Sequence, residues 1–372
     1  TDAFTASPKC LLFPNSSKDL DDTDTRYTDI LLACTRHLLD ELNQQANPGP
    51  LVSWLQSRWQ SLKDLALTEI EFENLALEAQ IAQFTTLTAT LRQVPSKRSV
   101  IRQQVDNHSV SLIEALNGFI AEAQRNLGAT ELVVIADELD RIALIQEDDG
   151  HTNYDEIYIY NSEQMSNLAC NVVYTVPISQ VYSDQSAEMR NIYGDIHVLP
   201  MVMVRMRDGT LYPPGLAKMK ELVQKRVGHY TQTAMVPDVF ESETVLDSLC
   251  LISGGHMREL MQLVQTALNW TDELPIRRQA MLRAIAKGRE AYQDTVNEVD
   301  WAKLAEVAET KRVPNDDSYR KLLFNRCVLE YRLVKETEDD FQTVRWHDVH
   351  PLIQKLEPYV QAVADRQANE GD

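Results

Sequence analysis

The stretch Glu131-Leu-Val-Val-Ile-Ala-Asp-Glu-Leu-Asp-Arg141 is the most informative part of this chain, and the fold is inferred outward from it. Its apolar run, residues 132–135, is typical of a strand buried on both faces, as in a parallel sheet. The run ends abruptly at acidic residues. We therefore expect an α/β fold in which Asp137 and Glu138 stand side by side where a buried strand stops.

The charge balance narrows the classes of partner. The 372 residues include 36 Lys and Arg against 56 Asp and Glu, so the formal net charge is −20. A phosphate-binding surface would have to be local and would work against a repulsive overall field. Nucleic acid is therefore not expected as the main partner.

The cysteines and the longest apolar runs indicate the compartment. Five cysteines lie far apart with no C-x-x-C pair, which suits thiols in a reducing environment. No apolar run approaches the length of a bilayer span, and residues 1–6 lack the basic start and apolar middle of a signal peptide. We expect a cytoplasmic protein with no membrane partner.

Helices are predicted before the strand at residue 132. Residues 9–13 form a short apolar run between two prolines, which predicts a brief buried strand, and apolar spacing predicts a helix over residues 27–42. Residues 51–94 contain neither Pro nor Gly, which predicts a long helical hairpin or arm inserted into the core. Another helix is expected over residues 110–127.

Two more apolar runs complete the predicted sheet. Residues 171–177 follow a helix expected over roughly 155–168, and residues 196–204 form a third run rich in Val and Met. Strands that alternate with helices indicate a parallel sheet covered on both faces. We place the end of this core, residues 1–215, near Gly215.

Beyond residue 215 the pattern is mostly helical. Residues 216–312 are assigned to a helical lid, with helices over 216–226, 241–252, 256–268, 275–292 and 300–310. In the last block, residues 313–372, a helix over 316–325 precedes a hairpin of 328–332 and 341–346. That order predicts a winged-helix-like domain.

Asp137 and Glu138 are the candidate catalytic residues. The stretch resembles the Walker B strand of a P-loop ATPase, whose end must deliver one carboxylate to Mg²⁺ and another to the attacking water. In this interpretation Asp137 holds the metal through its water shell, and Glu138 orients or deprotonates the water. The alternative is a strand that simply ends at an acidic, solvated turn.

Thr175 and Arg258 are candidate nucleotide-sensing residues. Thr175 lies at the tip of the second run, where such enzymes place a sensor of the γ-phosphate, although Thr is also an ordinary β-former. In Ser253-Gly-Gly-His-Met-Arg-Glu-Leu260 a Gly pair separates two helices and places Arg258 near a helix start. Because a cation is disfavoured there, an anionic partner is expected: a nucleotide phosphate, or a surface pair with Glu259 or Glu221.

The order of these motifs resembles the bacterial AAA+/STAND-type ATPases, in particular their Orc-like and KAP-like branches. The resemblance spans about residues 9–352, and its specific parts are the Walker B strand and the Gly-Gly-His-Met-Arg segment. It implies ATP and Mg²⁺ as cofactors, a helical lid, a winged helix, and a homo-oligomer or protein partner. By analogy the protein is a nucleotide-dependent switch, as in bacterial defence systems.

The chain departs from that family at the phosphate loop. No G-x-x-x-x-G-K-[ST] motif occurs in the sequence, and no glycine precedes Gly49. This loop supplies most of the grip on a triphosphate, and the strand that leads into it lies inside the sheet, beside the sensor strand. We expect an upstream segment that carries the loop, and weak or no ATP binding by this chain.

A pseudo-ATPase scaffold that acts through protein contacts is the second hypothesis. Its interaction surface would be the arm over residues 51–94, with Trp54 and Trp59 on one stripe, although such a stripe can equally pack on its own domain. A DNA-binding winged helix is disfavoured by the net charge.

Two smaller groups of residues have structural and functional interpretations. His347 and His350 have the spacing of metal ligands on a helix, but a capping or core role is favoured. Lys97, Arg98 and Arg102 are candidates for anion binding or for an arginine finger, and the alternative for them is a solvated face.

Overall fold

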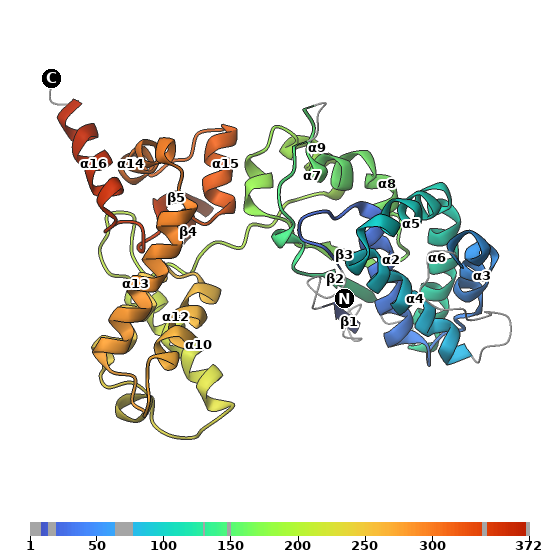
Figure 1. Cartoon of the computed structure of the whole chain (residues 1–372), viewed down its shortest axis with the longest axis horizontal. Helices are drawn as coiled ribbons and strands as arrows, with labels where there is room; N and C mark the ends of the chain where they lie inside the picture. Colours follow the sequence, from blue (N-terminus) through green and yellow to red (C-terminus); the bar gives the residue numbers. More distant parts are fainter. Residues whose placement is uncertain are drawn as a thin grey trace. The chain divides into compact units, whose positions relative to one another are not determined.

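The structure is a computed structural model that describes residues 9–13, 20–63, 77–128, 131–146, 150–336 and 341–369. Its contacts divide the chain into two compact units, Thr1–Ile196 and His197–Asp372. Figure 1 shows both units, with labels on many of their helices and strands.

Unit 1 contains the predicted parallel sheet. Strands β1 (Lys9–Phe13), β2 (Leu132–Ala136) and β3 (Asn171–Tyr174) are parallel and lie in the order β1-β2-β3. Val134 of β2 is in register with Leu11 on one side and with Val172 on the other. The prediction of an α/β chain with a parallel sheet is therefore confirmed.

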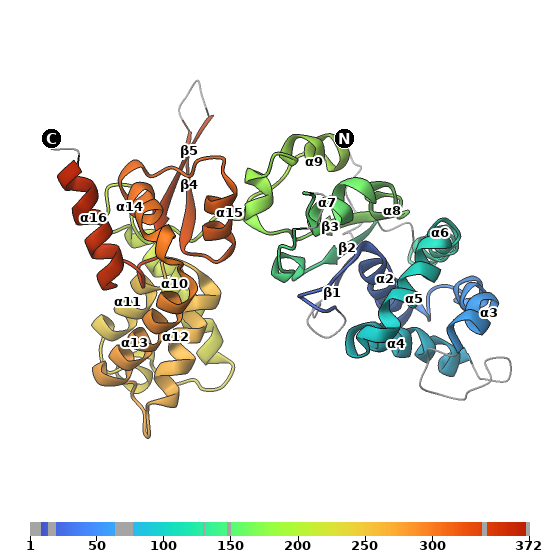
Figure 2. The ribbon, with the colours of Figure 1, turned by 45° about the horizontal axis from the view of Figure 1, so that its top comes forward.

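Helices make most of the core of unit 1, and α2 to α6 lie together on one side of β1 and β2 (Figures 1 and 2). Val134 joins Leu32, Phe84 and Phe119 in a single buried cluster. These helices are α2 (Tyr27–Leu42), α3 (Gly49–Lys63), α4 (Leu77–Gln93), α5 (Pro95–Asn107) and α6 (Ser109–Asn126).

The predicted arm is part of this core. On α3, Leu51 and Leu55 are fully buried, and Trp54 is only 6% exposed. The indole Nε1 of Trp54 donates to Ser111 Oγ on α6 at 3.0 Å. The hypothesis that Trp54 forms an interaction surface is therefore wrong, and the alternative, that Trp54 packs on its own domain, is confirmed. The side chain of Trp59 lies outside the described residues.

Short helical segments connect and follow the strands. The helix predicted over residues 155–168 is present as a succession of short pieces rather than one regular helix. After β2 and β3 the chain forms η2 (Leu139–Arg141), α7 (Asn153–Asp155), η3 (Glu156–Tyr160), α8 (Ser162–Ser166), η4 (Ile178–Tyr182) and α9 (Ser186–Tyr193).

The third predicted strand, residues 196–204, is not a strand of the sheet. Its backbone instead bonds within unit 2: Met201 N donates to Glu330 O at 3.0 Å and Val202 N to Gly255 O at 3.1 Å. The sheet therefore ends at β3 within the described part of the chain. Val173 on β3 is 48% exposed, so the expectation of a sheet covered on both faces is also wrong there.

Unit 2 has the helices and the hairpin that the sequence predicts. It also contains α16, in a region where no helix was expected. Its main elements are α10 (Pro213–Gly228), α11 (Glu243–Ile252), α12 (Met257–Asn269), α13 (Arg278–Thr295), α14 (Trp301–Thr310), α15 (Asp317–Phe324), the antiparallel strands β4 (Val328–Glu336) and β5 (Phe341–Val349), and α16 (Glu357–Asn369).

The expected boundaries at residues 215 and 312 differ from the observed division after Ile196. Met203 packs with Leu329, Tyr331 and Trp346, so the segment before residue 215 belongs to the core of unit 2. This segment passes close to Gly255: a Cβ on Gly255 would lie 1.7 Å from Val202 O, so only a glycine fits at that position. The expected lid and terminal domain are therefore parts of one unit.

No membrane-spanning candidate is found among the helices of the described residues: none has both the length and the apolar composition to cross a bilayer.

Candidate carboxylate site at the edge of the sheet

Asp137 and Glu138 follow directly after β2, at the carboxyl edge of the sheet, and both are half-buried. Glu138 has φ 66°, a left-handed backbone that costs a non-glycine residue about 1–2 kcal/mol. Asp137 Oδ1 accepts from Glu138 N at 2.8 Å, which holds the two residues in this turn. Strained backbone of this kind is concentrated at functional sites, although it does not by itself establish one.

Thr175 lies at the same edge and is bonded to the same turn. Its backbone N donates to Ala136 O at 3.2 Å and so extends the pairing of β2 with β3 by one step. Its hydroxyl Oγ1 accepts from Leu139 N at 3.2 Å, one residue beyond Glu138. Thr175 therefore ties the tip of β3 to the turn that carries the two carboxylates.

Asp22 also belongs to this edge, and the sequence analysis did not single it out. The guanidinium of Arg141 lies 3.4 Å from Glu138 Oε1 and 4.0 Å from Asp22 Oδ2. Ala143 N donates to Asp22 O at 2.6 Å, which fastens the loop after β1 to the chain after β2. Its position after β1 could have indicated this, because residues that follow neighbouring parallel strands meet at one edge of the sheet. Asp22 was missed because it lies several residues beyond the end of β1.

The site does not form a complete metal cage. The described residues contain no group of three or more His, Cys, Asp or Glu side chains placed to hold a metal ion. Mg²⁺ in proteins is usually bound by one or two carboxylates together with waters and substrate phosphates. Asp137 and Glu138 therefore fit a magnesium site only where a phosphate group completes it.

Arg258 lies in unit 2, exposed near the start of α12, whereas Asp137, Glu138 and Thr175 belong to unit 1. Glu221, considered above as a surface partner for it, bonds to Lys218 and Lys225 at 2.8 and 2.9 Å. The N-cap of α12 is His256, whose Nδ1 accepts from Glu259 N at 3.0 Å. Burial, then the charges of Arg326 and Arg258, lower the pKa of His256 to about 4.

His350 has a core role, as favoured from the sequence. It follows β5 rather than lying on a helix, and its side chain is fully buried. Its Nδ1 accepts from Leu352 N at 3.2 Å, and its ring stacks on Tyr292 with centroids 4.5 Å apart. Burial lowers the pKa of His350 to about 3.

Arg98 and Arg102 make ion pairs within unit 1 and do not form a solvated face. Arg98 bonds to Asp24 at 2.5 Å and to Asp21 at 2.8 Å, and its side chain is only 5% exposed. Arg102 pairs with Asp24 at 3.0 Å and also with Asp29. The side-chain bond from Thr23, with further bonds that include Arg98, lowers the pKa of Asp21 to about 2. Both guanidinium groups thus hold the loop before α2.

Comparisons of the chain with protein-family models, with curated proteins and with solved structures found no match. The functional argument therefore depends on the residues and their geometry.

Proposed function

We propose that Asp137 and Glu138 form the acidic half of an ATP–Mg²⁺ site and that the protein is a regulatory ATPase of the AAA+/STAND type. The observation that supports this most is the pair of adjacent carboxylates at the carboxyl edge of a parallel sheet. Parallel α/β sheets bind ligands at this edge. The left-handed backbone of Glu138 and the bond from Leu139 N to Thr175 Oγ1 give the turn a defined geometry.

The proposal requires a phosphate-binding half that the printed sequence does not contain. Backbone N–H groups, a lysine and a hydroxyl would have to come from a segment or subunit beyond these 372 residues. Within the described residues the outer edge of β3 carries no paired strand. That edge lies beside Thr175, where the resembled family has the strand that leads into its phosphate loop.

The side chains then have distinct roles. Asp137 holds the magnesium through its water shell, and Glu138 accepts the proton of the attacking water or orients it. Thr175 senses the terminal phosphate, and Arg258 is the second proposed nucleotide-sensing residue. ATP hydrolysis would change these contacts and so switch the protein between two states.

Glu138→Gln in the protein isolated from its own cells tests the proposal. The substitution keeps the shape of the side chain and removes the base, so we expect ATP to bind and hydrolysis to fall at least about 100-fold. The matched control is Glu131→Gln, the same change on an exposed residue at the other end of β2, which should leave hydrolysis unaltered. Equal turnover by both variants would exclude Glu138 as the catalytic residue.

The second candidate is a pseudo-ATPase scaffold. No described strand pairs with the outer edge of β3, and Val173 on this strand is 48% exposed. This favours the scaffold, because a partner strand can add to such an edge. If the protein isolated from its own cells binds no ATP at millimolar concentration but retains a protein partner, the scaffold replaces the enzyme.

A further inference from the structure

A second concentration of charge lies in unit 2, where one face of the β4–β5 hairpin lines a pocket of about 630 Å³. Three arginines line it, Arg312, Arg332 and Arg345, together with His347 and Thr343. Lys311 is also at its wall, but the ammonium of Lys311 pairs with Asp348 at 2.7 Å. No acidic residue is among the described residues that line it. For a chain of net charge −20, this is an unusual local composition.

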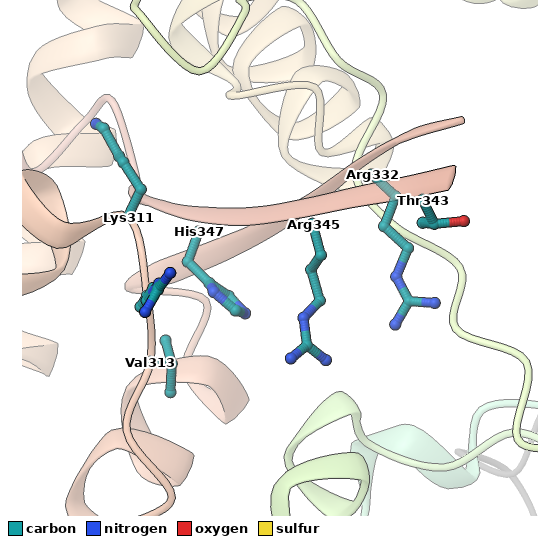
Figure 3. A pocket seen from close by; sticks show the side chains of 7 residues that line it. Lys311, Val313, Arg332, Thr343, Arg345 and His347 are labelled. Atoms are coloured by element: carbon teal, nitrogen blue, oxygen red, sulfur yellow. The ribbon is translucent and has the colours of Figure 1, made fainter. Parts of the chain in front are cut away.

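The strand register explains how the charges meet. In the antiparallel pair, Arg332 lies directly opposite Arg345. Two residues along each strand, and so on the same face, Glu330 lies opposite His347. Figure 3 shows Arg332, Arg345 and His347 projecting from one side of the hairpin. Like charges that face each other across two strands are destabilising, so this arrangement is maintained against a cost.

Other contacts hold the walls of the pocket in place. Lys311 ends α14 with a left-handed backbone, φ 56°, and its carbonyl O accepts from His347 N at 3.1 Å. This bond lays the segment that begins with Lys311 and Arg312 beside β5. Underneath, the buried carboxylate of Glu330 bonds to Arg332 Nε at 2.5 Å and so fixes the direction of that guanidinium.

We infer that this pocket binds a small ligand that carries two or more phosphate groups. Guanidinium groups bind phosphate oxygens through paired N–H donors, and several of them around one cavity match a di- or triphosphate. The volume lies within the range of small-molecule pockets, about 300–1,000 Å³. The negative charge of the whole chain disfavours a long nucleic acid, because only the phosphates inside the pocket would be attracted.

Arg345 and Arg312 are the binding residues, because both are exposed, and Arg332 is a third that Glu330 positions. Removing Arg332 would leave Glu330 buried without this partner and could unfold the hairpin. The exposed pair therefore makes the better test.

Calorimetry of the 372-residue chain with inorganic tripolyphosphate tests the inference. One molecule should bind per chain, and Arg345→Gln and Arg312→Gln should each weaken binding at least about tenfold without altering the fold. The matched control is Lys225→Gln, which removes a 74% exposed cation on α10 of the same unit and should leave binding unchanged.

The outcomes separate this site from the carboxylate site of unit 1. Any ATP that this chain binds by itself should be lost in Arg345→Gln and retained in Asp137→Asn, whichever way the test of Glu138 turns out. No tripolyphosphate binding at millimolar concentration, or binding by both arginine variants as tight as that of the unaltered chain, would overturn the inference. Tighter binding of duplex DNA or RNA through the same arginines would assign the pocket to a nucleic-acid backbone and would also overturn it.

Discussion

Three residues have a backbone or side-chain environment that the surrounding structure imposes. Glu138 adopts a left-handed backbone at the tip of β2, and Gly255 stands where a side chain would collide with Val202 O. His350 is a third case, since it is a titratable ring with no exposed surface and a pKa held near 3 by burial. At each position the surrounding structure, rather than local sequence preference, decides the backbone conformation, the side-chain size or the burial.

The burial of His350 predicts a dependence of stability on pH. Because its pKa falls from the ordinary 6.5 to about 3 on folding, the unfolded chain binds the proton more readily. The stabilising contribution of the neutral ring is complete above pH 6.5 and is lost as the pH falls toward 3. From pH 7 to pH 5 this residue alone should reduce the free energy of unfolding by about 2 kcal/mol.

His350→Asn isolates this effect, since an amide can still accept from Leu352 N but does not titrate. Glu259, whose pKa is raised by burial, acts in the opposite sense, and His256 acts in the same sense, so the comparison with wild type is essential. Hydrogen exchange of amides in α13 and β5 at pH 7 and pH 5 measures the difference. An identical loss of protection in both proteins would show that His350 is not responsible.

At the scale of elements, helix α3 shows why an apolar stripe does not identify its own partner. The stripe of α3 predicts burial equally well against a neighbouring protein or against its own domain. In the structure it packs on α6, where Trp54 meets Ser111. The run over residues 196–204 is similar, because its apolar composition predicts burial but not which unit buries it.

Trp54→Ala should destabilise unit 1 by about 3–5 kcal/mol, the usual cost of removing a buried large aromatic side chain. Ser111→Ala, which removes only the partner of the indole N–H, should cost about 1 kcal/mol. Trp270→Ala is the exposed control, with 52% of the residue accessible, and should change stability little. Urea denaturation measures all three. A normal midpoint for Trp54→Ala would restore the interpretation of α3 as a binding surface.

At the scale of the whole molecule, the division after Ile196 assigns the segment before residue 215 to unit 2. Met203 is 8% exposed in the cluster of the β4–β5 hairpin, and Tyr331 Oη donates to Gly254 O at 2.7 Å beside it. Helices of the expected lid and strands of the expected terminal domain thus share one core.

Two fragments test this boundary. A fragment of residues 197–372 should unfold cooperatively, whereas a fragment of residues 216–372 should be less stable by about 3 kcal/mol, because it lacks the buried Met203 and the backbone bonds of Met201 and Val202. Circular dichroism during urea denaturation measures both. Equal stability of the two fragments would favour the boundary near Gly215.

The sequence by itself determined the local elements of this protein. The runs at residues 132 and 171, the helix at Tyr27–Leu42 and the hairpin near the end of the chain follow from periodicity, which acts over a few residues. Asp137, Glu138 and Thr175 could be placed at one edge because parallel strands end on the same side of a sheet.

Only the tertiary structure decided which surfaces meet. It placed residues 197–204 in unit 2, buried Trp54 against α6, brought Asp22 to the sheet edge, and set Arg332 opposite Arg345 in a pocket. Most of these contacts join residues far apart along the chain, and hydrophobic burial has no direction of its own. An apolar or charged pattern therefore indicates that a partner is needed, and shape and register select which one it is.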